Sequence, residues 1–220
     1  MTDAAPTPSH AYDAYAESRF RPDPRRQGVW REIARYLREY SPPEGSVLDL
    51  GSGYCDLINS VEARRRYALD RYLDPARFAA PGVTPIVADA WDLSAVPEPL
   101  DAVFASNLLE HLSYEQASDV ARAVHAALRP GGHWVLVQPN FRYCATTYFD
   151  DYTHRTIFTH VGLADFLRAH GFEVARVEAR FMPFSLQSRL PAWRPLVRCY
   201  LQLPWRPLAK QMLVVGRRPG

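Results

Sequence analysis

Short apolar segments alternate with amphipathic segments along most of the chain. Residues 46–50, 102–106 and 133–138 are short apolar runs typical of buried strands, whereas 113–128 has helical periodicity. The full set of predicted strands is 46–50, 66–69, 84–88, 102–106, 133–138, 172–180 and 211–217. Helices are predicted at about 54–63, 113–128 and 160–170, with a weak helix or loop at 75–80. Strand–helix–strand units with short loops predict a parallel sheet with helices on both faces.

Turn and cap residues punctuate this alternation. Ser113, followed three residues later by Gln116, predicts the start of the helix over 113–128. The Arg-Pro-Gly-Gly segment at 129–132 predicts a turn, and 139–159 reads as a long loop. The stretch 182–209 is too long for a plain connection, and we expect it to be partly helical and functional.

The first 40 residues are separate from the alternating pattern. Residues 1–11 are predicted to be disordered, and 12–40 to form one or two helices broken near Pro22 and Pro24. We therefore divide the chain into a disordered start with a helical lid at 1–40 and one α/β domain at 41–220, which includes the excursion 182–209.

Composition supports a globular protein of one large domain. The chain has 220 residues, of which 47% are hydrophobic and 23% charged. Neither a run of 18 apolar residues nor a signal-peptide pattern is found, so we predict a cytoplasmic protein. The three cysteines, Cys55, Cys144 and Cys199, are too far apart for a metal-binding pair, and no metal site is expected.

Charge is distributed unevenly along the chain. Eight basic residues and no acidic residue follow Glu178, so this stretch carries +8 and the rest −6, for a net charge of +2. The same stretch holds large apolar residues, among them Trp193 and Trp205. A peripheral membrane contact, a lipid-linked substrate or a homodimer contact would use both properties, whereas a helix packed on the sheet edge would need neither.

The sharpest local motif is the segment 47–56, in which an apolar strand runs into a glycine loop. Glycines allow a tight turn and close approach of the backbone to a ligand. A dinucleotide fingerprint starting at Gly51 would need glycine at position 56, where this chain has Asp56. Asp49, just before the loop, suits a cationic ligand group better than a phosphate.

Asp49-Leu50-Gly51-Ser52-Gly53 resembles the first signature of class I S-adenosylmethionine-dependent methyltransferases, with Cys55 at the position of a third glycine. The resemblance implies an α/β fold: a Rossmann-like, seven-stranded, mostly parallel sheet whose last strand is antiparallel. Within the family, the segments 53–59 and 148–158 look most like small bacterial methyltransferases of glycan or specialised-metabolite pathways.

Further signatures follow at intervals of about 20 residues. By resemblance, Asp70 accepts hydrogen bonds from the ribose hydroxyls, Asp89 and Ala90 contact adenine, and Asn107 lies beside the sulfonium and the methionine carboxylate. In related enzymes an N-terminal segment closes over the cofactor. Here it would contribute Tyr15 and Arg19, and Arg19 could pair with the carboxylate. The resemblance thus implies a cofactor-binding set of Tyr15, Arg19, Asp49, Gly51, Gly53, Asp70, Asp89, Ala90 and Asn107. Each also has a plain structural interpretation, as a turn, strand end, cap or surface helix.

Candidates for proton transfer follow the fourth and fifth strands. His154 lies beside Asp150 and Asp151, the usual arrangement of a general base with a carboxylate. His111, after Glu110, is a second candidate, although a histidine at this place can also be structural. We predict His154, Asp151 and His111 as the catalytic group.

Several functions are compatible with these residues. The first is methyl transfer, at oxygen, to a small-molecule, sugar or lipid-linked acceptor. The second uses S-adenosylmethionine otherwise, for example by cyclising its aminobutyryl arm, and the third is a non-catalytic cofactor-binding module. Ser106-Asn107-Leu108-Leu109 lacks the Pro-Pro-aromatic pattern of base methylation, so no nucleic-acid partner is expected. An acidic triplet for Mg²⁺ was not found either, which disfavours a metal-dependent catechol-type mechanism.

Overall fold

The computed structural model describes residues 23–183 and 193–220. Their centre is a seven-stranded sheet with the order β3-β2-β1-β4-β5-β7-β6. β1, β2, β3, β4 and β5 run parallel, whereas β7 is antiparallel to both of its neighbours. The strands are β1 (Ser46–Leu50), β2 (Arg65–Leu69), β3 (Val83–Ile86), β4 (Leu100–Ser106), β5 (Leu128–Pro139), β6 (Glu173–Glu178) and β7 (Gln211–Arg217). The predicted Rossmann-like architecture is confirmed.

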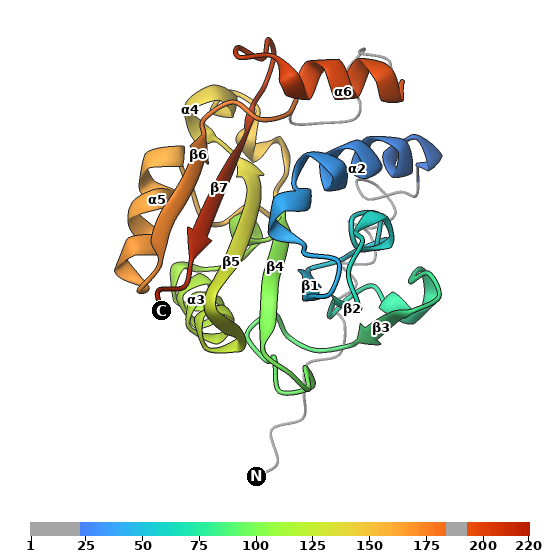
Figure 1. Ribbon diagram of the computed structural model, residues 1–220. Coiled ribbons are helices and arrows are strands. Elements are labelled where there is room, and N and C mark those ends of the chain that lie inside the picture. The colour runs from blue at the N-terminus through green and yellow to red at the C-terminus, as the bar shows by residue number, and fades with distance from the viewer. Residues whose placement is uncertain (1–22, 184–192) are drawn as a thin grey trace.

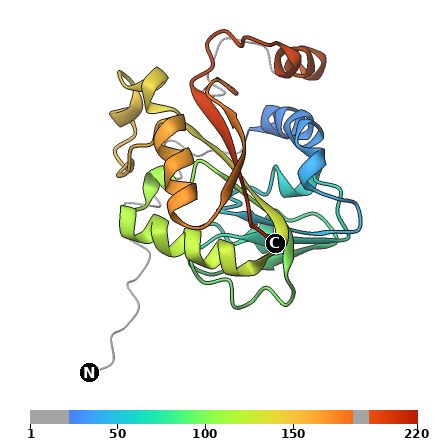
Figure 2. The ribbon, with the colours of Figure 1, turned by 60° about the vertical axis from the view of Figure 1, so that its left-hand side comes forward.

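Helices cover both faces of the sheet (Figures 1 and 2). α2 (Pro24–Tyr36) and α6 (Arg194–Gln202) pack on one face, where residues such as Ile33 and Val197 join Val47 in one core. α3 (Tyr114–Ala127) and α5 (His160–Ala169) pack on the other, where Val120 and Leu163 join Leu48. Strand side chains alternate between the faces, so β1 feeds both cores and is buried throughout.

Local sequence explains how the main helices begin. Asp23 caps α2 by accepting a hydrogen bond from the Arg25 N–H at 2.9 Å, and Pro24 takes the first helical position, where its missing N–H costs nothing. The helix thus begins at Pro24, where the sequence predicted a break near Pro22 and Pro24. Ser113 and Gln116 form the predicted capping box of α3.

The helix predicted at about 54–63 is wrong. Only a single 3-10 turn, Ile58–Ser60, occurs there. Gly53 and Cys55 have φ angles of 50° and 58°, which a right-handed helix cannot contain. α2 covers the sheet face on which such a helix would pack, since Ile33 joins Ile58 in the same core.

Two other predictions need correction. The segment 129–132 is not a separate turn, because β5 already begins at Leu128, which pairs with Leu100. The register then shifts between Leu100 and Ala102, and Gly131 takes a φ of 82°, so the bend lies inside the strand. The loop predicted at 139–159 contains α4 (Phe141–Cys144) and a 3-10 turn, Tyr148–Asp150.

The carboxyl ends of β1, β2, β4 and β5 lie at one edge of the sheet, since these strands are parallel. α4 follows β5 at this edge (Figure 1). Among the described residues, the helices are too short or too polar to cross a membrane. Parallel α/β sheets bind ligands beyond this edge, so a ligand site is expected there.

Candidate active site

The glycine loop turns back against the end of β2. The N–H groups of Gly51 and Ser52 both donate to the Leu69 carbonyl, at 2.9 and 3.0 Å. Gly51 has a φ of 70°, and a Cβ there would lie 3.0 Å from Leu108 Cδ1. The positive φ therefore favours glycine at this position, and the Leu108 side chain would have to shift slightly to admit a Cβ.

Cys55, which stands where the methyltransferase signature has a third glycine, keeps the backbone shape of a glycine. Its φ is 58°, in the left-handed region, and its side chain is fully buried. Burial raises the pKa of the thiol to about 12, so this cysteine is an inert packing residue.

Asp49, the penultimate residue of β1, is a buried carboxyl group. Burial raises its pKa to about 7, the Ile58 N–H opposes the shift, and the nearby carboxylates of Asp70 and Asp56 add to it. The three carboxyl groups make this edge of the sheet electronegative, and a cation bound here would relieve their mutual repulsion.

Asp70 ties the loop after β2 to the glycine loop. Its Oδ1 accepts hydrogen bonds from the Tyr72 and Leu73 N–H groups at 2.8 and 2.9 Å, and its Oδ2 accepts one from Gly53 at 3.0 Å. A carboxylate has about four acceptor positions, so roughly one remains for a ligand hydroxyl. Asp70 thus stabilises the two loops and is also a candidate for binding a ligand hydroxyl.

Asp89 and Asn107 occupy the next two strand ends. Asp89 forms an ion pair with Arg71, and the neighbouring Ala90 packs on the α3 side of the sheet. Asn107 is exposed, with a φ of 51°, and its Oδ1 accepts a hydrogen bond of 2.7 Å from Gln211 Nε2. Asparagine tolerates this conformation well, so Asn107 turns the chain and also presents an amide at the site edge.

The first described helix, α2, reaches the same edge. Arg26 of α2 donates to Asp56 Oδ2 at 2.8 Å, which ties the helix to the glycine loop. The predicted N-terminal contacts Tyr15 and Arg19 precede α2 and lie outside the described residues.

A second cluster forms where the turn after β4 meets the loop after β5. The N–H groups of Arg155 and Thr156 donate to the Glu110 carbonyl at 2.7 and 3.2 Å, and the Thr156 hydroxyl donates to the Leu112 carbonyl. These bonds hold the loop against the turn, which brings His154 next to His111, with ring centroids 5.0 Å apart.

Hydrogen bonds define the tautomers of the two histidines. His154 Nδ1 lies 2.7 Å from the Tyr148 carbonyl, which can only accept, so Nδ1 carries the proton. His111 Nδ1 lies 2.9 Å from Thr153 Oγ1, whose single proton is donated to Asp151 Oδ1 at 2.6 Å. Thr153 must therefore accept from His111. In both neutral rings Nε2 is the atom that bears the lone pair.

The carboxyl groups of the cluster differ in their surroundings. Burial raises the pKa of Glu110 to about 8, and Asp151 adds to the shift. Burial also acts to raise the pKa of Asp151, yet hydrogen bonds from the hydroxyl and N–H of Thr153, together with attraction to the two histidines when they are protonated, hold that pKa below its usual value. Asp151 Oδ2 lies 4.0 Å from His154 Nε2. The structure thus brings His154, Asp151 and His111 together.

The aromatic residues of the loop have different environments. Tyr148 is buried, and its phenol donates to the Thr156 carbonyl. Tyr143 is covered by Arg180, 3.9 Å above its ring. Phe149 and Tyr152 are exposed and remain candidates for stacking on an acceptor ring.

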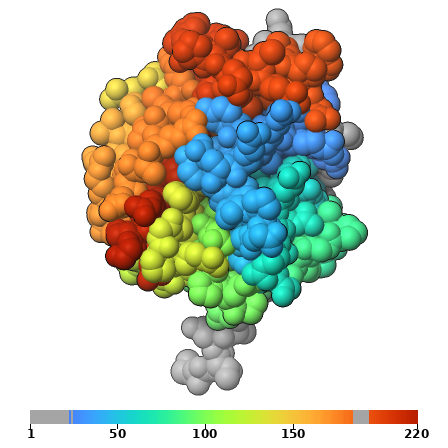
Figure 3. Space-filling model, viewed as in Figure 1, coloured from blue at the N-terminus to red at the C-terminus, as the bar shows by residue number. Residues whose placement is uncertain are grey.

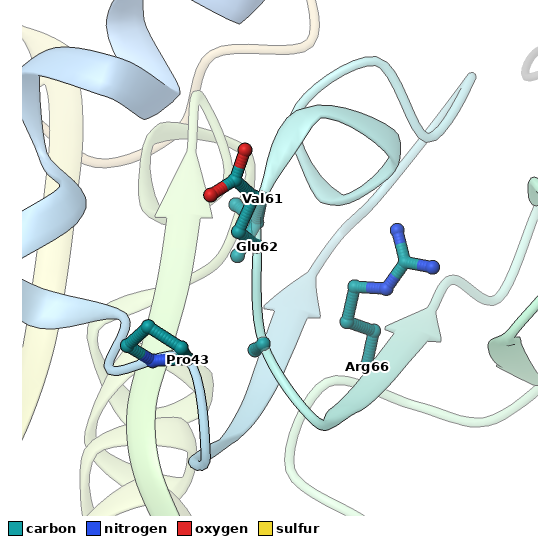
Figure 4. A pocket seen from close by; sticks show the side chains of 5 residues that line it. Pro43, Val61, Glu62 and Arg66 are labelled. Carbon is teal, nitrogen blue, oxygen red and sulfur yellow. The ribbon is translucent and has the colours of Figure 1, made fainter.

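Two cavities lie away from these groups. One, of about 320 Å³, lies beside the amino-terminal ends of β1 and β2, where Pro43, Glu62 and Arg66 line it (Figure 4). The other, of about 570 Å³, lies between α2, α6 and β6, with Glu32 and Arg176 in its walls. Neither contains a residue of the two clusters at the carboxyl edge.

Comparison with known proteins agrees with this arrangement. Residues 23–177 match the model of a methyltransferase domain. Among curated proteins, none matches the sequence significantly.

Similar solved structures share the fold. A SAM-dependent methyltransferase from Archaeoglobus fulgidus is 18% identical, with a TM-score of 0.67 over 96% of this chain and 100% of the other. One from Mesorhizobium loti is 24% identical, with a TM-score of 0.59 over 84% and 96%. The CcbJ methyltransferase of Streptomyces caelestis is 14% identical, with a TM-score of 0.60 over 88% and 90%.

Proposed function

Since the chain belongs to the methyltransferase-domain family and is a class I S-adenosylmethionine-dependent methyltransferase, we propose that it methylates a hydroxyl group of a small-molecule or glycan acceptor. The observation that carries this proposal is the pairing of two clusters at one edge of the sheet. The first cluster, which we call the cradle, is the electronegative glycine loop with Asp49 and Asp70 at the ends of β1 and β2. The second, the histidine cluster, is the buried group of Glu110, His111 and His154 after β4 and β5.

The cradle fits a ligand that carries positive charge. S-adenosylmethionine, when bound, supplies a methyl group on a sulfonium that is already a good leaving group. Asp49, Asp70 and Asp89 would hold its charged and polar parts, with Ala90 beside them. Gly51 and Gly53 keep the backbone free of side-chain atoms at the bend, and Asn107 offers an amide from β4.

The histidine cluster would serve the acceptor. A hydroxyl group is a poor nucleophile until a base accepts its proton, and His154 presents a lone pair on Nε2 with Asp151 close by. His111 is held by Thr153 and supports the same group. Alignment of acceptor and methyl group would contribute several kcal/mol, up to about 7–11 in ideal cases.

The reaction is tested by product analysis with labelled S-adenosylmethionine and a metabolite extract. We expect S-adenosylhomocysteine together with a methylated product that mass spectrometry identifies. Methylthioadenosine would indicate cyclisation of the aminobutyryl arm instead. Tight cofactor binding without any turnover would indicate a binding module.

The role of His154 is tested by His154→Ala. We expect kcat to fall by about 10²–10⁴-fold, the usual contribution of a general base, with cofactor affinity nearly unchanged. His125→Ala is the matched control, because His125 lies on α3 against Phe172, away from the cluster. An unchanged kcat in His154→Ala would remove this residue from the mechanism.

Partners beyond the acceptor concern the segment 182–209. Residues 184–192 lie outside the described part of the chain, and α6 follows them. Val197 and Leu201 of α6 are buried against the core, whereas Trp193 and Trp205 are exposed. A peripheral membrane contact, a lipid-linked acceptor and a homodimer each remain proposals for this surface.

A further inference from the structure

Three potential metal ligands converge beside the proposed acceptor position. Glu110, His111 and His154 each offer one ligand atom, and these atoms all lie within 4.8 Å of one another. Glu110 and His111 belong to the 3-10 turn Leu109–His111 after β4, and His154 comes from the loop after β5. Backbone hydrogen bonds to the Glu110 carbonyl fix the two segments against each other, so the grouping does not depend on mobile side chains alone.

The hydrogen bonds at Nδ1 of His111 and His154 have the pattern that is common for metal-bound histidines. A metal-ligating imidazole usually donates its other ring N–H to a carbonyl or carboxylate, which fixes the tautomer and the ring orientation. His154 does this directly through the Tyr148 carbonyl, and His111 does it through Thr153 to Asp151. Both rings therefore carry a lone pair on Nε2, the form in which a neutral imidazole can coordinate a metal.

The environment of Glu110 also points to a bound cation. This residue is only 2% exposed, and its Oε2 has no hydrogen-bond partner among the described residues. A buried carboxylate without a partner is strongly unfavourable, and it becomes stable either by protonation or by binding a cation. Two adjacent imidazole nitrogens favour the second solution, because they would coordinate the same cation.

We propose that Glu110, His111 and His154 form a Zn²⁺ site. Two histidines and one glutamate are a common ligand set for zinc, and three protein ligands leave a fourth position for an oxygen atom. Mg²⁺ prefers oxygen ligands in an octahedral shell and does not suit two imidazoles. Metal binding needs neither cofactor nor acceptor, and the proposal rests on the proposed function in placing the acceptor oxygen at the fourth position. It also replaces the base role of His154 described above: with zinc bound, His154 would be a ligand, and the metal would favour loss of the proton from an acceptor hydroxyl at the fourth position.

Binding is measured on tag-free protein that has been stripped with a chelator and desalted. We expect one Zn²⁺ per chain by elemental analysis and a rise in Tm with Zn²⁺ but not with the same concentration of Mg²⁺. Co²⁺ should give the visible spectrum of a four-coordinate site without a thiolate charge-transfer band, which separates this site from Cys199, the exposed cysteine.

Variants assign the site to its residues. Glu110→Gln and His154→Gln should each abolish the stoichiometric ion and the Tm shift, and Thr153→Val should weaken binding about 10–100-fold by releasing His111. His125→Gln and Cys199→Ser are controls and should bind as the native chain does. If Zn²⁺ binds equally well to Glu110→Gln and His154→Gln, or does not bind the native chain above the level of these two variants, the proposal is overturned.

Failure of this proposal can be told apart from failure of the proposed function. A protein that turns over fully after chelation and binds no Zn²⁺ keeps its methyltransferase activity and loses the metal site. A protein that binds one Zn²⁺ through these residues but methylates no hydroxyl acceptor keeps the metal site and loses the proposed acceptor class.

Discussion

At the scale of single residues, the clearest consequence concerns the ionisation of Asp49. Burial raises the pKa of this carboxyl group to about 7, above its unfolded value of 3.8, so below pH 7 the folded chain holds it neutral. A cationic ligand favours the ionised form. Binding of S-adenosylmethionine below pH 7 should therefore release a proton, and affinity should fall by up to about tenfold per pH unit as the pH is lowered. Calorimetry in buffers of different ionisation enthalpy measures both effects.

Asp49→Asn is the matched variant for this prediction. It keeps the size of the side chain and removes the titrating group, so we expect weaker binding that no longer depends on pH in this range. Asp92→Asn serves as the control, because Asp92 is an exposed loop residue hydrogen-bonded to Ser94. A native chain whose affinity is independent of pH below 7 would show that Asp49 does not sense the cofactor charge.

The residues of the cradle were predictable from sequence, and those of the metal cluster were only partly so. Asp49, Gly51 and Asp70 stand at strand ends that the apolar pattern defines, so their proximity follows from a parallel sheet. His154 lies 43 residues after His111, on a loop whose path depends on hydrogen bonds to the Glu110 carbonyl. The adjacent Glu110-His111 pair after β4 was the sequence signal for this cluster. Hydrophobic periodicity, however, does not predict that the loop after β5 places His154 beside that pair.

At the scale of elements, one buried glutamate joins the first and last described helices. Glu32 of α2 is 2% exposed, and its two oxygens accept hydrogen bonds from Arg194 at 3.0 Å and from Arg198 at 2.9 and 3.1 Å. Figure 3 shows the orange-red residues around α6 lying against the blue residues of α2, the helix that contains this glutamate. The ion pairs help to fix α6 against α2, in addition to the burial of Val197 and Leu201 in the shared core.

Glu32→Gln should lower the free energy of unfolding by about 1–3 kcal/mol, since it leaves the arginines without their charge partner. The two arginines are half-exposed, so in the variant water can solvate their guanidinium groups. We therefore expect a loss of free energy in the lower part of this range. Arg198 and Arg194 lower the pKa of Glu32, so its contribution is present above pH 4.5, and the difference between native chain and variant should vanish as the pH falls. Urea unfolding at several pH values measures it.

Glu39→Gln provides the comparison for that measurement. Glu39 pairs with Arg176 at 2.8 Å, but its side chain is 60% exposed, and such pairs contribute about 0–1 kcal/mol. Equal effects of the two variants would show that Glu32 does not fasten α6 to α2.

Sequence predicted some elements well and others not at all, for identifiable reasons. The bounds of β1 and β7 were correct because each is an apolar run between polar residues. The helix expected at 54–63 is missing because the positive φ of Cys55 cannot be inferred for a residue other than glycine. The excursion 182–209 was expected to be partly helical, and α6 confirms this for its described part.

At the scale of the whole molecule, the charge asymmetry along the chain is partly neutralised by the fold. Of the basic residues after Glu178, Arg194 and Arg198 pair with Glu32, Arg206 pairs with Glu178, and Arg217 pairs with Glu173. The acidic partners all come from earlier in the chain, so a segment that reads as +8 in sequence is partly a set of internal contacts. An electrostatic attraction to anionic surfaces should therefore be weaker than the sequence alone indicates.

We consequently expect any contact of this surface with a membrane to depend on Trp193 and Trp205, which are 68% and 67% exposed, and not on lipid charge. Sedimentation with vesicles should show similar binding to zwitterionic and anionic lipids, little change with salt, and loss of binding in the double variant Trp193→Ser/Trp205→Ser. Tyr114→Ser is a control, because Tyr114 is also exposed but lies on α3, on the other face of the sheet. Binding restricted to anionic vesicles and removed by salt would contradict this prediction, since screening acts on unpaired surface charge. The absence of binding to either lipid would remove the membrane contact and leave a homodimer or a lipid-linked acceptor as the remaining uses of the two tryptophans.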